Sequence, residues 1–503
     1  MACVRVPFQD ASKQTKSLVS GRPGVLSLIG NTPVVEVTSF DTGLCRLWVK
    51  LENQNPGGSI KDRIGLSMIE TAERQGILKP GAIIIEATAG NTGLGLALVA
   101  AQKGYHLILV VPDKMAREKV LHLKALGAEV KTTRSDVGKG HPEYYQDIAK
   151  RLAAEIPGSF FVNQFENESN PLAHETSTGP EIWQQMGGQV DAIVCGVGSG
   201  GTLTGLGRFF KKVSPCTEMV LADPKGSVLA PFVNTGVMIE AGSWAVEGIG
   251  EDFLPAILDL SFVKAAYTIT DEEAFEYARE LLSREGILAG SSSGTLFCAA
   301  LKYCRDQKTP KRVLTFICDS GNKYLSKMYN DFWMMEQGFL KLRLRNDVSD
   351  LVTRRFEAGG TIYCGPSDTV RTAYSRMRAA DVSQLPVLES GMLVGILDES
   401  DVLRAVTALD NKSNPFGALV NTVMVKDVQT LESTAPISAL LPFFEADRVA
   451  VITQDGKFMG LVTRVDLINH MKLHQYEPRT PVLDVLSPKA KEGVQLNLDP
   501  AQA

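Results

Sequence analysis

The chain has 503 residues, which is too many for one ordinary core, so we expect two or three domains. Its 52 basic and 57 acidic residues give a net charge of −5, which provides no basic surface for nucleic acid and no polybasic arm for membranes. No apolar run reaches the length of a membrane span, and residues 1–24, the expected N-terminal arm, lack the apolar core of a signal peptide.

Cysteine and histidine usage indicates the compartment. The eight cysteines form no CxxC pair, and the six histidines do not cluster near them. A disulfide framework or a metal site is therefore not expected, and reduced thiols fit a cytoplasmic protein better. The hydrophobic fraction of 44% and the charged fraction of 22% are normal for a soluble globular protein.

Residues 25–337 alternate short apolar strands with helical patterns. One helix start is marked by Thr270 and Glu273, which form a capping box, and Gly286 marks the end of that helix. The strand candidates are residues 82–86, 106–111, 191–195, 219–222 and 313–318, and further helix candidates are 64–75 and 143–155. This alternation predicts an α/β domain with a mostly parallel sheet that is covered on both faces.

The string NPGGSIKDR, residues 55–63, joins the strand-like run 47–51 to a helix that starts near Asp62. Gly57 and Gly58 allow the turn to approach a ligand closely, and Ser59 can accept from the first free amides of the helix. Lys61 is thereby held at a strand-to-helix junction, where a neutral amine could attack a carbonyl carbon. A lone lysine after glycines is weak evidence, because most lysines are solvated charges.

A second loop, TAGNTG at residues 88–93, lies between an apolar strand and a helix. Its small residues leave backbone amides and two threonine hydroxyls facing a helix N-terminus, which suits an α-carboxylate. The alternative is an ordinary tight turn, and the residues alone do not decide between them.

Two more loops of small residues follow strands downstream. GSGGT, residues 198–202, exposes consecutive N–H groups and two hydroxyls before a helix, so a phosphate is the natural ligand. It is neither a dinucleotide fingerprint nor a Walker loop. GSSSGT, residues 290–295, could offer a neutral hydroxyl to a pyridine nitrogen, and a helix N-cap cluster is its alternative explanation.

Beyond a predicted linker at 338–360 lies an internal repeat. Equivalent residues, such as Val387 and Ile452, or Asp401 and Asp466, are 65 positions apart. Each copy predicts a strand, a tight turn, a strand and a helix. Two such units packed together would bury apolar surface that one unit alone could not. The units are expected at about 361–410 and 418–475 within a module spanning 361–475, with a loosely ordered tail at 476–503.

The four loops occur in an order that resembles the fold-type II pyridoxal-phosphate enzymes (tryptophan synthase β-like), the family of the cysteine synthases and cystathionine β-synthases. The matching strings are GNTP at 30–33, NPGGSIKDR, TAGNTG, NQFENESNPLAHETSTGPEI from 163, GVGSGGT and GILAGSSSG. The resemblance implies pyridoxal 5′-phosphate bound to Lys61, which would also shuttle the α-proton. It implies the following ligands: Asn91 for the pyridine 3′-oxygen; Gly198, Ser199, Gly200, Gly201 and Thr202 for the phosphate; Ser292 for the pyridine nitrogen; Thr88, Ala89, Gly90, Thr92 and Gln164 for the substrate carboxylate.

The reaction implied by this resemblance is β-replacement. Lys61 would remove the α-proton, the β group would leave, and a thiol would add to the β-carbon, with the cofactor as electron sink. The leading hypothesis is condensation of L-serine with L-homocysteine to cystathionine and water, with hydrogen sulfide from side reactions. The alternatives are cysteine synthesis from O-acetylserine and sulfide, and a catalytically inert partner that senses nucleotides.

The repeat resembles a Bateman module of two CBS domains, which cystathionine β-synthases carry and ordinary cysteine synthases lack. In such modules a Gly-x-x-Thr-x-x-Asp string binds the ribose of an adenosyl ligand, and Thr463 and Asp466 complete this string in the second copy. The first copy has Asp398 where the hydroxyl should stand. A purely structural or dimerising module is the alternative, and the resemblance implies a homo-oligomer, a dimer or a tetramer.

Three departures from the family pattern bear on substrates and cofactors. Eukaryotic cystathionine β-synthases usually have tyrosines where this chain has Phe165 and Glu251, and Glu251 resembles the heme-free, bacterial-type enzymes. The N-terminal heme-binding extension is missing, since Cys3 stands alone and the first histidine is His106. We therefore predict no heme.

Overall fold

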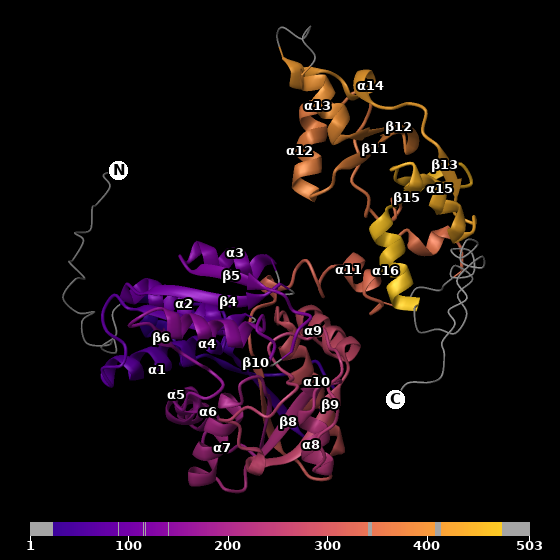
Figure 1. Ribbon diagram of the computed structural model, residues 1–503. Coiled ribbons are helices and arrows are strands. Elements are labelled where there is room, and N and C mark those ends of the chain that lie inside the picture. Colours follow the sequence, from indigo (N-terminus) through magenta and orange to yellow (C-terminus); the bar gives the residue numbers. More distant parts are fainter. Residues whose placement is uncertain are drawn as a thin grey trace, which may run out of the picture. The chain divides into compact units, whose positions relative to one another are not determined.

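The computed structural model describes residues 24–88, 90–113, 115, 117–138, 140–340, 345–407 and 414–474, and they form two compact units that part between Tyr329 and Asn330 (Figure 1). Among these residues, no helix combines the length and apolarity needed to cross a membrane.

The first unit contains two sheets. The six-stranded sheet has the order β1-β2-β10-β7-β8-β9, and only its edge pair β1–β2 is antiparallel; the four-stranded sheet β5-β4-β3-β6 is parallel throughout. The strands are β1 Val34–Glu36, β2 Arg46–Leu51, β3 Ile83–Ala87, β4 His106–Pro112, β5 Glu129–Thr133, β6 Phe160–Phe161, β7 Ala192–Gly196, β8 Glu218–Pro224, β9 Val263–Ile269 and β10 Arg312–Ile317. The predicted α/β class is therefore confirmed, and each predicted strand lies within two residues of an observed one.

Helices cover both faces of these sheets (Figure 1). They are α1 Lys61–Arg74, α2 Asn91–Lys103, α3 Arg117–Ala125, α4 Tyr145–Glu155, α5 Ser169–Ala173, α6 Gly179–Gln185, α7 Gly201–Val213, α8 Leu229–Thr235, α9 Asp271–Glu285 and α10 Ser291–Asp306, with a π-helical turn at His174–Thr178. Alternation along β3 explains the layers, because Ile84 packs with α1 and α2 whereas its neighbour Ile85 packs with α4. The predicted capping box at Thr270 is present, and α9 ends at Gly286 with φ of 69°.

The second unit contains the internal repeat. Its elements are α11 Asp331–Glu336, α12 Val370–Ala380, β11 Gln384–Glu389, β12 Met392–Asp398, α13 Glu399–Thr407, α14 Val420–Val423, β13 Thr430–Glu432, α15 Leu441–Glu445, β14 Ala450–Gln454, β15 Lys457–Val462 and α16 Arg464–His474. Both hairpins turn through two residues with positive φ, Ser390-Gly391 and Asp455-Gly456, again 65 positions apart. Such turns match the twist of antiparallel strands, so the repeated sequence folds into repeated structure.

The expected linker at 338–360 differs from what the structure contains. Val348, Leu351 and Val352 are buried in the core of the second repeat, and the Phe356 amide donates to the Met459 carbonyl at 2.8 Å. These apolar residues recur at helical spacing, but they lie in a segment that also carries many arginines and lysines, which is why composition indicated a linker. The boundary likewise falls before α11, which packs on α16 of the same unit. The expected arm, residues 1–24, lies outside the described residues except for Gly24, and the expected tail, residues 476–503, lies outside them entirely.

Candidate active site

Lys61 is the first residue of α1 and lies at the carboxyl end of β10. The turn before it is tied to that strand end, because the Ile60 amide donates to the Cys318 carbonyl at 2.9 Å and Ser59 forms a bridge with Asp319. The Lys61 amide itself donates to Ser59 Oγ at 3.2 Å. Burial lowers the pKa of the Lys61 amine, and the nearby Cys318, Asp319 and Glu251 offset this only in part. A larger fraction of the Lys61 amine is therefore neutral here than in water, and only the neutral amine can act as a nucleophile.

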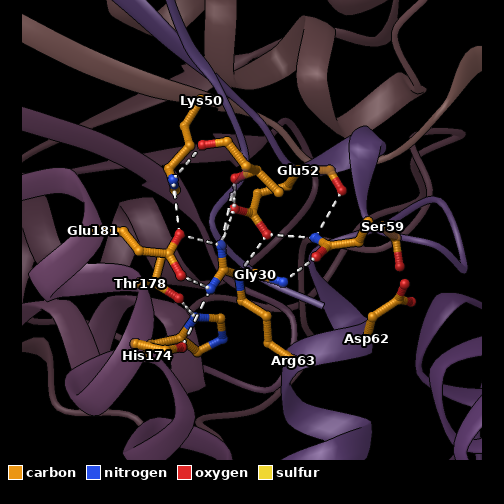
Figure 2. A network of polar contacts seen from close by, with 12 residues as sticks. Gly30, Lys50, Glu52, Ser59, Asp62, Arg63, His174, Thr178 and Glu181 are labelled. Carbon is orange, nitrogen blue, oxygen red and sulfur yellow. Dashed lines mark hydrogen bonds and ion pairs between the residues drawn. The ribbon is translucent and has the colours of Figure 1, made fainter. Parts of the chain in front are cut away.

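A buried charge network anchors the start of α1, and Figure 2 shows its members. Arg63 donates to Glu52 through Nε and Nη2 at 2.7 and 2.8 Å, and to Glu181 through Nη1 and Nη2 at 2.8 and 2.7 Å. Lys50 Nζ lies 3.0 Å from the same Glu181 carboxylate. Burial raises the pKa of Glu52, but Arg63 overcomes this and holds it at about 2. Sequence reasoning missed this network, although charged residues inside a buried strand were a signal.

The second loop meets Gln164 in the folded chain. Thr92 Oγ1 donates to Gln164 Oε1 at 2.7 Å, and Thr88 Oγ1 accepts the Gly90 amide at 3.2 Å. The structure therefore brings Thr88, Gly90, Thr92 and Gln164 together, whereas Ala89 lies outside the described residues. Their binding of a carboxylate stays a prediction.

Glu86 is a buried residue that sequence reasoning did not find. Its two carboxylate oxygens accept the backbone amides of Asn163 and Gln164 at 2.7 and 3.3 Å. Burial without a cationic partner raises the pKa of Glu86 to about 8. Glu86 thus fixes the backbone from which the Gln164 side chain reaches the second loop.

The third loop forms a narrow cradle at the start of α7. Gly200 has φ of 91°, and side chains added at Gly198 or Gly200 would come within 2.8 Å of Gly248 or Leu258. Asn170 Nδ2 donates to Ser199 Oγ at 2.9 Å, while Asn170 Oδ1 is buried without a hydrogen bond. Amides at a helix N-terminus, freed of side chains, provide the geometry for a phosphate.

His174 supports the same loop from behind. Its Nε2 lies 3.2 Å from Thr202 Oγ1, and its Nδ1 lies 2.9 Å from Thr178 Oγ1. Burial, together with the charges of Arg63 and Lys61, lowers the pKa of His174 to about 3, so the imidazole is neutral at neutral pH. The ring thus links the Thr202 hydroxyl to that of Thr178. Figure 2 shows His174 and Thr178 near Glu181.

The fourth loop opens α10 beside Lys61. Ser292 is buried and hydrogen-bonds with the Cys318 thiol, and the Cys318 amide donates to Ser293 Oγ at 2.9 Å. The thiol in turn lies in the electrostatic surroundings of Lys61. The structure therefore brings Ser292 close to the lysine, and the residue it offers is a neutral hydroxyl rather than a carboxylate.

A carboxylate and an aromatic wall lie on another side of the cradle. Glu251 Oε1 would be 3.9 Å from a side-chain carbon at Gly198, and Glu251 also acts electrostatically on Lys61. The rings of Phe165 and Phe253 are 5.7 Å apart. The site thus combines a negative charge with apolar surface next to the predicted phosphate loop.

The residues predicted to bind an adenosyl ligand form a helix cap. Asp466 Oδ2 accepts from the Thr463 amide at 2.6 Å and from Thr463 Oγ1 at 2.7 Å. In the first repeat, Asp398 and Asp401 exchange backbone and carboxylate hydrogen bonds at 2.8 and 3.0 Å. Each pair caps the start of a helix, α16 in the second repeat and α13 in the first.

Comparison with known proteins identifies the family. Residues 25–319 match the model of the pyridoxal-phosphate dependent enzymes, and residues 348–408 and 420–473 match the CBS domain. Cystathionine beta-synthase of Rattus norvegicus is 39% identical over 440 residues, 86% of this chain and 78% of the relative. Cysteine synthase A of Escherichia coli K12 is 42% identical over 301 residues, 59% of this chain and 92% of the relative. The solved O-acetylserine dependent cystathionine beta-synthase from Helicobacter pylori is 39% identical, with a TM-score of 0.56 over 60% of this chain and 97% of that chain.

The fold and the site thus define a pyridoxal-phosphate-dependent enzyme of fold type II, which carries two CBS domains at its C-terminal end. The chain belongs to the family of the cystathionine β-synthases and the related cysteine synthases, which are β-replacement enzymes. Enzymes of this family use pyridoxal phosphate. The residues present fit this cofactor: a desolvated lysine, a glycine cradle at a helix N-terminus and a buried neutral hydroxyl converge on one end of the large sheet.

Proposed function

We propose that the chain condenses L-serine with L-homocysteine to L-cystathionine and water. The observation that carries this proposal is Glu251, a carboxylate beside the phosphate loop and within electrostatic reach of Lys61. Homocysteine brings an ammonium group that a carboxylate attracts, whereas hydrosulfide is an anion that it repels. The matches to cystathionine beta-synthases along both units support the same choice.

The residues have distinct tasks in this reaction. The bound cofactor supplies an electron sink that makes the α-proton of the amino acid acidic. The Lys61 amine, whose pKa burial lowers, takes and holds that proton. Thr88, Thr92 and Gln164 bind the α-carboxylate, and the cradle at 198–202 holds the phosphate. Ser292 binds the pyridine nitrogen without protonating it, because a hydroxyl is a far weaker acid than a carboxylic acid.

Turnover with two substrate pairs tests the proposal. Wild type should form cystathionine from serine and homocysteine, and Glu251→Gln should lower kcat/KM for homocysteine about tenfold, which corresponds to one charge-assisted contact. The same variant should use sulfide as well as wild type does. Asp252→Asn is the matched control, since this neighbouring carboxylate is exposed. Reaction only with O-acetylserine and sulfide would overturn the proposal.

O-acetylserine as the first substrate is a second candidate, and the Helicobacter pylori enzyme, described as O-acetylserine dependent, supports it. Competition between serine and O-acetylserine at fixed homocysteine distinguishes the two leaving groups. The convergence of Lys61 with the cofactor loops counts against an inert nucleotide-sensing partner. A yellow band near 410 nm, roughly where the bound cofactor absorbs, would exclude that alternative. We further propose hydrogen sulfide release from cysteine and homocysteine as a side activity.

We also propose that the second CBS domain binds an adenosyl ligand through Thr463 and Asp466, in a cytoplasmic homodimer or tetramer. The CBS-domain match supports the binding, and Asp398 disfavours the first site because it replaces the ribose-binding hydroxyl. Equilibrium binding of S-adenosylmethionine, AMP and ATP to wild type and to Asp466→Ala tests it. Asp466→Asn keeps an oxygen acceptor for the helix cap, so a loss of affinity in this variant would reflect ligand binding rather than folding. Unchanged affinity in both variants would refute the assignment.

A further inference from the structure

Lys323 is a buried lysine whose ammonium group connects two loops of the site. Its Nζ donates to the Gly57 and Gly58 carbonyls at 3.3 and 3.2 Å, and to Asn91 Oδ1 at 2.8 Å. An ammonium has three hydrogens, and these three acceptors use all of them. Lys323 therefore ties the turn before Lys61 to the loop that holds Asn91.

The other end of the Asn91 amide contacts a carboxylate. Asn91 Nδ2 donates to Asp319 Oδ2 at 2.8 Å, and the Tyr324 hydroxyl donates to the same oxygen at 2.8 Å. Tyr324 is held in turn by Lys119, whose Nζ lies 3.0 Å from the phenol oxygen. Asp319 is thus fixed in place as an acceptor for Asn91.

These two contacts determine which way the amide faces. An ammonium can only donate and a carboxylate can only accept, so a flipped amide would place Nδ2 against Lys323 and Oδ1 against Asp319. The flip would replace two charge-assisted hydrogen bonds by two repulsive contacts. In the observed orientation, the contacts with the described residues use one Nδ2 hydrogen of Asn91 and leave the second for a ligand.

We propose that Lys323 and Asp319 are positioning residues that hold the Asn91 amide so that it donates to the 3′-oxygen of the cofactor. The inference rests on the proposed function and on the predicted role of Asn91. A donated hydrogen bond stabilises the ionised 3′-oxygen, so the orientation of the amide sets the protonation equilibrium of that oxygen. The charged groups that act on Lys323 besides Asp319 are Lys119 and Asp62.

The test is a pH titration of the visible band of the purified holoenzyme. Lys323→Met should shift the apparent pKa upward by about one unit, a tenfold change in the protonation equilibrium, since one ion-supported hydrogen bond is lost. Lys323→Arg should restore most of the wild-type value, because a guanidinium also only donates. Lys327→Met is the matched control, since this lysine lies on the same segment but pairs with Glu247 at 2.7 Å.

A double substitution separates positioning from plain charge loss. Removal of a nearby positive charge would raise the same pKa directly, but that effect would persist in an Asn91→Ala background. Positioning predicts that Lys323→Met has little further effect once Asn91 is gone. Three results would each overturn the inference: a full shift of the apparent pKa in the Asn91→Ala background, no shift in Lys323→Met, or an equal shift in Lys327→Met. If the methionine variant does not fold, Lys323→Gln replaces it in the same titrations. A glutamine amide can both donate and accept, so it permits both orientations of the Asn91 amide.

The outcome for this inference is distinguishable from the outcome for the proposed function. A wild-type protein without a visible band, or a band that persists in Lys61→Ala, would remove the proposed function itself. A wild-type band that depends on Lys61 but does not respond to Lys323→Met would remove only the positioning role.

Discussion

Arg63→Met should strongly destabilise the first unit, because it breaks buried ion pairs with Glu52 and Glu181. Arg63 is 3% exposed and Glu52 is fully buried, so the variant would leave a carboxylate in the core without its main counter-charge. Lys50 remains in its electrostatic surroundings, and Thr32 still donates to it at 2.7 Å. The variant therefore removes most of the compensation for Glu52, but not all of it.

Two routes give a similar magnitude for this loss. Breaking a buried ion pair by removing one partner typically costs about 3–5 kcal/mol. The displacement of the Glu52 pKa from its ordinary 4.5 to about 2, the net result of burial and of all its partners, corresponds to about 3 kcal/mol. Because Lys50 and Thr32 stay, we expect about 3 kcal/mol, the lower end of the first range.

Urea unfolding measures this loss in the catalytic unit alone. The chain has four tryptophans, and Trp333→Phe leaves only Trp48, Trp183 and Trp244, all in the first unit. Arg134→Met is the matched control, because Arg134 makes ion pairs of similar length at the surface and should hardly move the midpoint. Equal losses for the two arginines would refute the claim that burial makes the Arg63 pairs matter.

Three further outcomes are expected. The folded-state pKa of Glu52 lies below its unfolded value, so its contribution to the free energy of unfolding is complete above about pH 4.5 and should be lost as pH falls toward 2. Acid unfolding of wild type would show this loss, and Glu52→Gln should lessen it. Glu86→Gln should raise KM for the amino-acid substrate about tenfold above pH 8, where the Glu86 carboxyl group is ionised, with a smaller change in kcat. The ionised group accepts two backbone N–H groups, whereas the NH2 group of glutamine accepts none; an unchanged KM in steady-state assays would contradict this. Gly200→Ala should weaken cofactor binding by at least about tenfold in equilibrium titrations, since φ of 91° is strained for alanine and its side chain would crowd Leu258; wild-type affinity would show that the cradle is not needed.

The sequence predicts best what neighbouring residues determine. The turn before Lys61 and the capping box at Thr270 follow from residues within a few positions of one another, and the start of α7 follows from the positive φ of Gly200. The repeat was found because equivalent residues keep a fixed spacing, and the paired positive φ values at Gly391 and Gly456 confirm it in the structure. Local chemistry therefore predicted the elements and the loops.

The partners of these loops could not be predicted in the same way. Arg63 meets Glu181 across 118 positions, and Lys323 meets Asn91 across 232 positions. No local pattern marks either pair, because each residue taken alone is an ordinary charge that would be solvated on most surfaces. Only the folded chain, which packs α1 beside α6 and the loop after β3 beside the turn after β10, brings them into contact.

Lys61 and Arg63 lie in the same helical turn, but their surroundings shift their pKa values in opposite directions. Burial disfavours both, and it alone would lower both pKa values. Two carboxylates at hydrogen-bond distance reverse the effect for Arg63 and raise its pKa above the ordinary value. Around Lys61 the carboxylates act without such contacts, and its pKa stays low. The carboxylates of the buried network pair with Arg63 and Lys50, and those that raise the pKa of Lys61, two residues away, are Asp319 and Glu251 instead.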